Sequence, residues 1–277
     1  ANTALDPLFI FTLDMGTAGA ALATGLSQFI SFCILLWMCN HQDSCISISI
    51  RKFRPKLAIY REVLYGGIPS LGRQGIASVA TILMNFMCQP YGDAAIAAMS
   101  IVSRFMFFIN SVIIGFGQGF QPVCSYCFGA GLYDRVKKAC WFCIRVSTII
   151  LLVLSVISFP AARSIITLFR RNDPTVIEIG TLALRLQLIT LPLQGAVIMG
   201  NMMPQSIGYG FRATLVSIAR QGIFLIPLLT IMTYTIGLLG IQCAQPLADI
   251  ATFILSLFVI RGIFKEFPED ASSFAAQ

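Results

Sequence analysis

Charged residues are scarce in this 277-residue sequence. Asp, Glu, Lys and Arg make up 11% of it, against about 25% in soluble domains, while 57% of the residues are hydrophobic. A chain with so few charges cannot cover a globular surface with polar side chains, which excludes an ordinary soluble domain. The net charge of +7 does not indicate a nucleic-acid partner, because the basic residues are confined to the segments between long apolar runs. We expect no nucleic-acid binding.

Histidine occurs only once, as His41, between two apolar runs. A histidine-based metal site, or acid–base catalysis by histidine, is therefore hard to build. Deep within the apolar runs the sequence has one clear acid, Asp249, so the paired acids of a membrane-embedded hydrolase are also missing. We therefore predict that the protein is not an enzyme and has no metal or organic cofactor.

Long apolar runs are what the sequence has in abundance. Seven of them reach the roughly 20 residues needed to cross a bilayer. They are expected near 16–38, 63–88, 94–120, 139–162, 176–203, 213–234 and 238–260. Residues 1–13 are expected to be the tail of an eighth helix, and the absence of an initial Met or a charged leader favours a fragment over a signal peptide. The sequence predicts an all-α polytopic membrane protein.

Basic residues are distributed unevenly between alternate loops. Eleven lie in loops on one side of the predicted spans, and three lie on or near the other side. The eleven are Arg51, Lys52, Arg54, Lys56, Arg61, Arg135, Lys137, Lys138, Arg212, Arg261 and Lys265, and the three are Arg163, Arg170 and Arg171. Because basic loops stay in the cytoplasm, we expect a multi-pass protein of the inner (plasma) membrane with a cytoplasmic C-terminus.

Two CxxC pairs, Cys124–Cys127 and Cys140–Cys143, are separated by twelve residues. In a soluble protein this spacing would indicate a zinc ribbon. Here one pair closes a predicted span and the other opens the next, and cysteine packs well between helices as a small apolar residue. No acidic or histidine partner is evident nearby, so we expect these pairs to pack in the bundle.

Polar residues recur at helical spacing inside the apolar runs. In the last run Gln242, Gln245, Asp249, Thr252 and Ser256 fall on one helical face. Such stripes form either hydrogen-bonded seams between helices or the wall of a substrate cavity. A charge at the centre of a bilayer costs at least about 2.5–3.5 kcal/mol on insertion scales. Asp249 is therefore expected to be functional or ion-paired.

The candidate substrate and ion pathway consists of charged residues within the spans and of amides at helical spacing. Among the charged residues, Arg104 lies deep in its span, as Asp249 does. These candidates are Arg73, Gln74, Asn85, Arg104, Gln118, Gln194, Asn201, Gln205, Arg220, Gln245 and Asp249. Of the arginines, Arg73 and Arg220 are expected nearer the membrane interface, where they could snorkel. Methionines and phenylalanines beside the pathway would suit flat apolar ligands, but lipid-facing bulk is the simpler interpretation.

A long-range repeat links the first and last runs. GTAGAALATGLSQ at 16–28 and GLLGIQCAQPLAD at 237–249 share an offset of 221 residues, which aligns Gly16 with Gly237, for example. Repeated halves are typical of secondary transporters, which bind substrate between the halves, so a full chain would have about 440 residues and twelve helices. The predicted parts are 1–39 as the end of a first lobe, 40–62 as a cytoplasmic loop, 63–262 as a second six-helix lobe and 263–277 as a tail.

Several motifs resemble the multidrug and toxic compound extrusion (MATE) transporters, and their bacterial multidrug export members above all. They include DPLFIF, GTAGAALAT, YGGIPSLGRQGIASVATILMN, GFGQGFQPVCSYCFGAGLYDRVKKA, NMMPQSIGYGFRA and GLLGIQCAQPLADI. The resemblance implies two six-helix lobes around a central cavity, and export of amphipathic organic cations in exchange for H⁺ or Na⁺. We expect a monomer whose other partners are membrane lipids.

Two observations qualify the resemblance. Family members with a well-defined cation site in the second lobe carry an acid on the first helix of that lobe, whereas here 67–85 has none and offers Arg73 and Gln74. The predicted spans also contain four arginines but a single deep acid. The arginines are Arg73, Arg104, Arg185 and Arg220. This excess of positive charge favours an alternative function. That alternative is a lipid-linked oligosaccharide flippase of the same superfamily.

These 277 residues alone are expected not to transport, because one lobe lacks the opposing wall of the cavity. The measurement is gradient-driven ethidium transport in vesicles that hold only this chain. Transport by the isolated chain would contradict the two-lobe interpretation.

Overall fold

The computed structural model describes residues 2–12, 14–41, 57–170 and 173–267, and the side chains among them except at 11, 39–41, 58–59 and 61–73. Every regular element in these ranges is helical, as the apolar composition predicts. The chain forms two units, Ala1–Arg61 and Glu62–Gln277, which are described separately.

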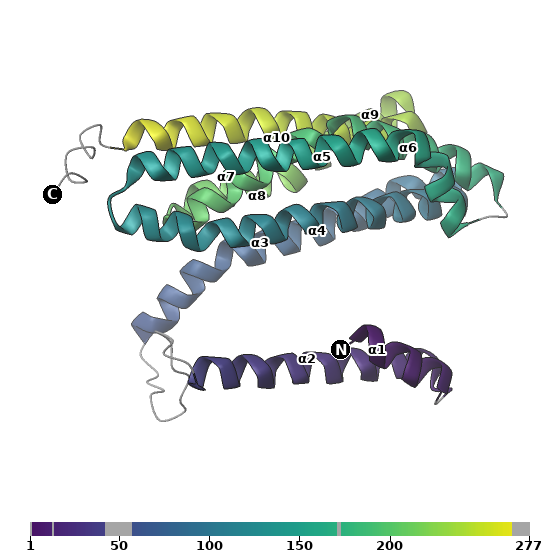
Figure 1. The fold of residues 1–277 in the computed structure, drawn as a ribbon. Coiled ribbons are helices and arrows are strands. Elements are labelled where there is room, and N and C mark those ends of the chain that lie inside the picture. Colours follow the sequence, from purple (N-terminus) through teal and green to yellow (C-terminus); the bar gives the residue numbers. More distant parts are fainter. Residues whose placement is uncertain (1, 13, 42–56, 171–172, 268–277) are drawn as a thin grey trace. The chain divides into compact units, whose positions relative to one another are not determined.

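The first unit is a helical hairpin. Its elements are α1 (Asn2–Pro7), the π-helical segment η1 (Leu8–Thr12) and α2 (Gly16–His41). Both α1 and η1 pack against α2 (Figure 1). The amide of Asn2 donates a hydrogen bond to Thr24 Oγ1 at 3.2 Å, which links α1 to α2.

The second unit is a bundle of long helices that run up and down beside one another (Figure 1). Its elements are α3 (Leu57–Cys88, which begins before the boundary), η3 (Gln89–Tyr91), α4 (Asp93–Gly129), α5 (Tyr133–Phe169), α6 (Pro174–Thr190), η4 (Leu191–Leu193), α7 (Gln194–Ser206), α8 (Gly210–Ile218), η5 (Ala219–Leu225), α9 (Ile226–Ile236) and α10 (Leu238–Glu266). α10 packs against α6, α7 and α9, and α5 packs against α4, α6 and α7. This packing buries a hydrophobic core between the helices, while many large apolar side chains stay exposed on the outside of the bundle.

Six helical stretches of the described residues are long and apolar enough to cross a membrane. They are Gly16–Met38, Asp93–Gly129, Tyr133–Phe169, Pro174–Ser206, Gly210–Ile236 and Leu238–Glu266. The remaining predicted span, 63–88, lies within α3, which is helical throughout but is not among the six. The count of seven spans therefore stays a prediction, whereas the all-helical, multi-pass fold is confirmed.

Two predicted spans contain irregular helical segments, and the one at Pro192 is at a proline that was expected from the sequence to interrupt or bound a helix. The span at 176–203 is interrupted by the 3₁₀ segment η4, which contains Pro192. A proline has no backbone N–H and clashes with the preceding turn, which explains the break. The span at 213–234 contains the π-helical segment η5 between α8 and α9. Both irregular segments lie next to the candidate site described below.

The four cysteines of the CxxC pairs belong to the hydrophobic core of the second unit. Cys124 and Cys140 are fully buried, and Cys127 and Cys143 are nearly so. All four thiols are free. Within the ranges that the structure describes, no three Cys, His, Asp or Glu side chains converge as a metal site requires. The place of the four cysteines in the core agrees with the prediction that they pack in the bundle.

One end of the second unit is held together by charged and aromatic contacts. Arg212 at the start of α8 forms a two-pronged ion pair with Glu266 at the end of α10. Phe128 and Tyr133, on either side of the α4–α5 turn, pack against Phe267. They are three of the four segments whose basic residues predicted a common side of the membrane, and the structure brings these three to one end of the bundle.

The two glycines that the repeat aligns have equivalent structural roles. Gly16 is the first residue of α2, and Gly237 immediately precedes α10. Both have positive φ, 53° and 70°, where residues with a side chain are rare. Three residues later, a Cβ on Gly19 would lie 2.7 Å from the Phe9 carbonyl oxygen, and one on Gly240 would lie 2.0 Å from the Met232 carbonyl oxygen. The G-x-x-G spacing thus turns the chain and then allows the new helix to approach the backbone of the preceding one.

Replacing Gly240 by alanine should destabilise the protein by about 1–3 kcal/mol, because the added methyl meets backbone rather than a movable side chain. Thermal unfolding of the detergent-purified protein measures the change. The matched control is Gly262→Ala on the same helix, where a Cβ meets nothing within 4 Å. Equal unfolding temperatures for the two variants would contradict the assigned role of Gly240.

Candidate substrate and ion pathway

A buried carboxylate, that of Asp249 on α10, anchors a closed hydrogen-bond network. Its side chain is 1% exposed. Arg220 Nε donates to Asp249 Oδ1 at 2.9 Å, and Gln194 Nε2 donates to Asp249 Oδ2 at 2.8 Å. Arg220 Nη2 also donates to Gln194 Oε1 at 2.9 Å, which closes the ring, and Gln245 Nε2 donates to Asp249 Oδ1 at 3.2 Å. We call Gln194, Arg220, Gln245 and Asp249 the Asp249 network.

The irregular segments of the bundle position this network. Gln194 is the first residue of α7 and follows directly on the break at Pro192. Arg220 is the second residue of the π-helical segment η5. A π-helical turn holds an extra residue, which rotates the side chains that follow, and such turns are frequent at functional sites. Breaks in two helices therefore aim an amide and a guanidinium at the same carboxylate.

The network explains how a charge is tolerated inside an apolar bundle. Burial of an unpaired carboxylate costs several kcal/mol, and the penalty is offset only when a partner charge and hydrogen bonds satisfy it. Asp249 receives three hydrogen bonds, one of them from a guanidinium, so both oxygens have donors. Arg220 balances the charge of the carboxylate at Oδ1, and the amide of Gln194 satisfies Oδ2.

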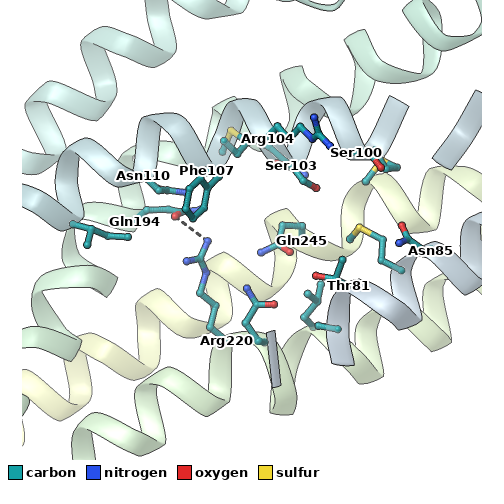
Figure 2. A pocket seen from close by; sticks show the side chains of 18 residues that line it. Thr81, Asn85, Ser100, Ser103, Arg104, Phe107, Asn110, Gln194, Arg220 and Gln245 are labelled. Carbon is teal, nitrogen blue, oxygen red and sulfur yellow. Dashed lines mark hydrogen bonds between the residues drawn. The ribbon is translucent and has the colours of Figure 1, made fainter. Parts of the chain in front are cut away.

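Members of the network border a cavity of about 460 Å³ inside the second unit. Its wall contains the side chains of α3, α4, α6, α7, η5 and α10. Figure 2 shows Arg220 and Gln194 joined on one side of this cavity, with Gln245 nearby and Arg104 on the opposite wall. Asp249 lies behind this wall, and Arg220, Gln194 and Gln245 connect it to the cavity.

The apolar part of the wall includes three methionines and a phenylalanine. Met84, Met99 and Met106 line the cavity together with Phe107. From the sequence, contact with lipid was the simpler interpretation of these bulky apolar side chains. In the structure they line the cavity. Flexible thioethers and an aromatic ring can adapt to flat ligands of differing shape.

The structure separates the predicted pathway residues into two groups. Gln194, Arg220, Gln245 and Asp249 form the network, and Asn85 and Arg104 line the same cavity. The residues that the structure does not place on the cavity are Gln74, Gln118, Asn201 and Gln205. Arg73 lies in α3, but its side chain is outside those that the structure describes.

Two of these placements differ from the expectations of the sequence. Asn201 continues the seven-residue row of Gln187 and Gln194, yet its amide donates to the Ala213 carbonyl and to Ser217 Oγ and so joins α7 to α8. Arg220 was expected near the interface, whereas its guanidinium pairs with the deepest acid. Sequence spacing fixes the helical face of a residue, but it does not show which neighbouring helix that face meets.

Three polar residues of the cavity wall were not recognised in the sequence. Ser100, Ser103 and Asn110 line the cavity from α4. Together with Phe107 they recur at spacings of 3, 4 and 3 residues, which is a helical stripe and was the available signal. Asn110 Oδ1 is buried without a hydrogen-bond donor in the described part of the chain.

The fold and this site define a multi-pass helical membrane protein with a polar cavity and a buried ion pair inside its bundle. Residues 69–231 match the family described as MatE, and the chain belongs to that family. The "Multidrug export protein MepA" of Staphylococcus haemolyticus is 28% identical over 98% of this chain. That of Staphylococcus aureus strain MRSA252 is 28% identical over 94% of it. The chain spans about 60% of the length of these relatives.

Solved structures of MATE transporters have the same fold. A structure described as the outward-facing conformation of a multidrug resistance MATE family transporter superposes with a TM-score of 0.86 at 25% identity, covering 96% of this chain and 60% of that one. A MOP superfamily transporter from Pyrococcus furiosus gives the same TM-score, identity and coverage. The relatives are named as export proteins or transporters, not as enzymes, and they do not favour the flippase alternative.

Replacing Arg220 by methionine should cost about 3–5 kcal/mol of stability, because Asp249 is left as an uncompensated buried charge. The double variant Arg220→Met/Asp249→Leu should recover most of that loss, since no charge then remains unpaired. Thermal unfolding in detergent measures both. Arg104→Met is the control, because Arg104 has no ion pair among the described residues. Equal losses for Arg220→Met and Arg104→Met would contradict the pairing.

Proposed function

We propose that the protein to which this chain belongs is a secondary active multidrug exporter in which the Asp249 network couples drug movement to an ion gradient. The observation that carries the proposal is a buried carboxylate, in contact with Arg220, whose partners line a cavity of ligand size. Membership of the MatE family and the similarity to multidrug export proteins support the substrate class, which is small amphipathic compounds.

The coupling follows from competition for Asp249. A proton or Na⁺ that binds the carboxylate weakens its bond to Arg220, and the guanidinium is then free to turn toward the cavity. An additional positive charge there repels an organic cation that rests against Phe107 and the methionines. Linkage is reciprocal, so a bound organic cation must equally oppose the binding of the coupling ion. This mutual exclusion is what exchange of drug for ion requires.

The network can accept either coupling ion. A proton needs only the carboxylate of Asp249. Sodium needs several oxygen ligands, and the side-chain oxygens of Gln194 and Gln245 lie on amides that already contact the carboxylate through their nitrogens. Rotation of these two amides would turn oxygen toward the ion. Imposed H⁺ and Na⁺ gradients distinguish the two ions.

We place the protein in the plasma membrane as a monomer with a cytoplasmic C-terminus. Basic loop residues support the orientation through the positive-inside rule. In the second unit, Arg135, Arg212 and Lys265 belong to segments that meet at one end of the bundle, held there by the Arg212–Glu266 ion pair and the aromatic contacts around Phe267. This common end agrees with a single cytoplasmic face for these segments.

Asp249→Asn in the full-length transporter should reduce gradient-driven uptake of ethidium into everted vesicles by at least about tenfold, because the neutral amide cannot hold or release the coupling ion. Membrane expression should be retained, since an amide keeps the volume, its oxygen can still accept from Arg220, and the unpaired guanidinium is partly exposed on the cavity wall. Uptake is measured with an imposed H⁺ gradient and, separately, with an imposed Na⁺ gradient.

The control for this experiment is Asp134→Asn, at an exposed position in the first turn of α5, which should transport as the wild type does. Full activity of Asp249→Asn would show that Asp249 has only a packing role. If neither gradient drives uptake by the wild type, ion-coupled export itself is wrong.

A further inference from the structure

We propose that a second cavity, between α5, α6 and α10, binds the headgroup of a bilayer glycerophospholipid, with two arginines on the phosphodiester. The cavity has a volume of about 770 Å³. Arg163 of α5, Glu178 and Arg185 of α6, and Gln242 of α10 all line it. None of these residues lines the drug cavity or belongs to the Asp249 network. We call this cavity the headgroup groove.

The charges of the groove fit a phosphodiester. Arg163 and Arg185 are both exposed, and neither forms an ion pair with Glu178 or with any other acid in the described ranges. The guanidinium of Arg185 lies 5.5 Å from the centre of the Phe159 ring, a contact that restrains the side chain. Guanidinium groups bind phosphate through paired hydrogen bonds, so two arginines without ion pairs on one groove, one of them restrained by an aromatic ring, suit a phosphodiester.

The position of the groove along the helices fits a headgroup in the membrane interface. Arg163 lies six residues before the end of α5, Arg185 eleven residues after the start of α6, and Gln242 four residues after the start of α10. At 1.5 Å per residue these positions are about 6–16 Å from the helix ends. On the predicted orientation this is the outer leaflet. Arginines at this depth reach the headgroup region from within the bilayer.

Apolar side chains of the groove favour a lipid over a free phosphate ion. Leu182 and Leu239 line it and are 42% and 50% exposed. They lie on helices that are long and apolar enough to cross a membrane. A lipid can cover such side chains with its acyl chains while its phosphate lies between the arginines. A soluble phosphate ester would leave them uncovered.

One buried polar atom indicates that the headgroup carries a hydrogen-bond donor. Gln242 is 2% exposed, and its Nε2 donates to the Ile179 carbonyl at 3.1 Å. Its Oε1 has no donor within the described part of the chain. Glu178 supplies a second acceptor on the same groove. A hydroxyl or ammonium of the headgroup can satisfy these acceptors directly or through one water. Phosphatidylglycerol and phosphatidylethanolamine have such donors, and phosphatidylcholine has none.

Native mass spectrometry of the full-length protein in detergent tests the site, with added lipids of identical acyl chains. The wild type should retain one molecule of phosphatidylglycerol or phosphatidylethanolamine more tightly than phosphatidylcholine, and should not retain glycerol 3-phosphate. Arg163→Gln/Arg185→Gln should weaken retention at least about tenfold. The matched control is Arg145→Gln, an exposed arginine of α5 outside the groove, which should retain lipid as the wild type does.

The outcomes are distinct. Equal retention by the double variant and the Arg145→Gln control would overturn the site, as would tight binding of glycerol 3-phosphate, which would indicate a free phosphate ester. Gln242→Met should reduce the preference for donor-bearing headgroups over phosphatidylcholine, and an unchanged preference would remove Gln242 from the site. Lipid retention is measured without any ion gradient, so it is independent of the transport proposal.

Discussion

The need to compensate one buried negative charge organises the centre of the second unit. Asp249 lies within a helix that is otherwise suited to a bilayer, and its carboxylate is tolerated because a guanidinium and two amides reach it. These groups come from α7, η5 and α10, so satisfying the charge also ties three segments together. The helix break before Gln194 and the π-helical turn at Arg220 are the local distortions that make these contacts possible.

The same interaction connects architecture with transport. Arg220, Gln194 and Gln245 form hydrogen bonds to Asp249 on one side and border the drug cavity on the other. A change in the charge of Asp249 therefore changes the hydrogen bonds of three residues in the cavity wall. The aligned position in the first unit is Gln28, which is exposed there and carries no charge. The repeat therefore preserves the G-x-x-G helix hairpin in both units, while the acid is present only in the second.

Much of the fold could be predicted from the sequence, and less of the site. Apolar run length located the six membrane-length helices of the described residues, and helical spacing placed Asp249 on the buried face of the last helix. Spacing could not show that Asn201 would bond to α8, or that Arg220 would turn inward from its π-helical segment. The serines of α4 went unnoticed for a related reason, since a polar stripe is equally compatible with a seam between helices and with a cavity.

The sequence by itself determined that the protein lies in a bilayer and is helical, and it also gave the repeat and the identity of the one deep acid. These features depend on composition and on spacing along a single chain. Only the tertiary structure decided which cation pairs with that acid, which stripe faces a cavity, and where unpaired arginines gather beside an unsatisfied glutamine. Those facts depend on how helices meet, and a side chain 30 or 50 residues away contributes nothing to local periodicity until the bundle has packed.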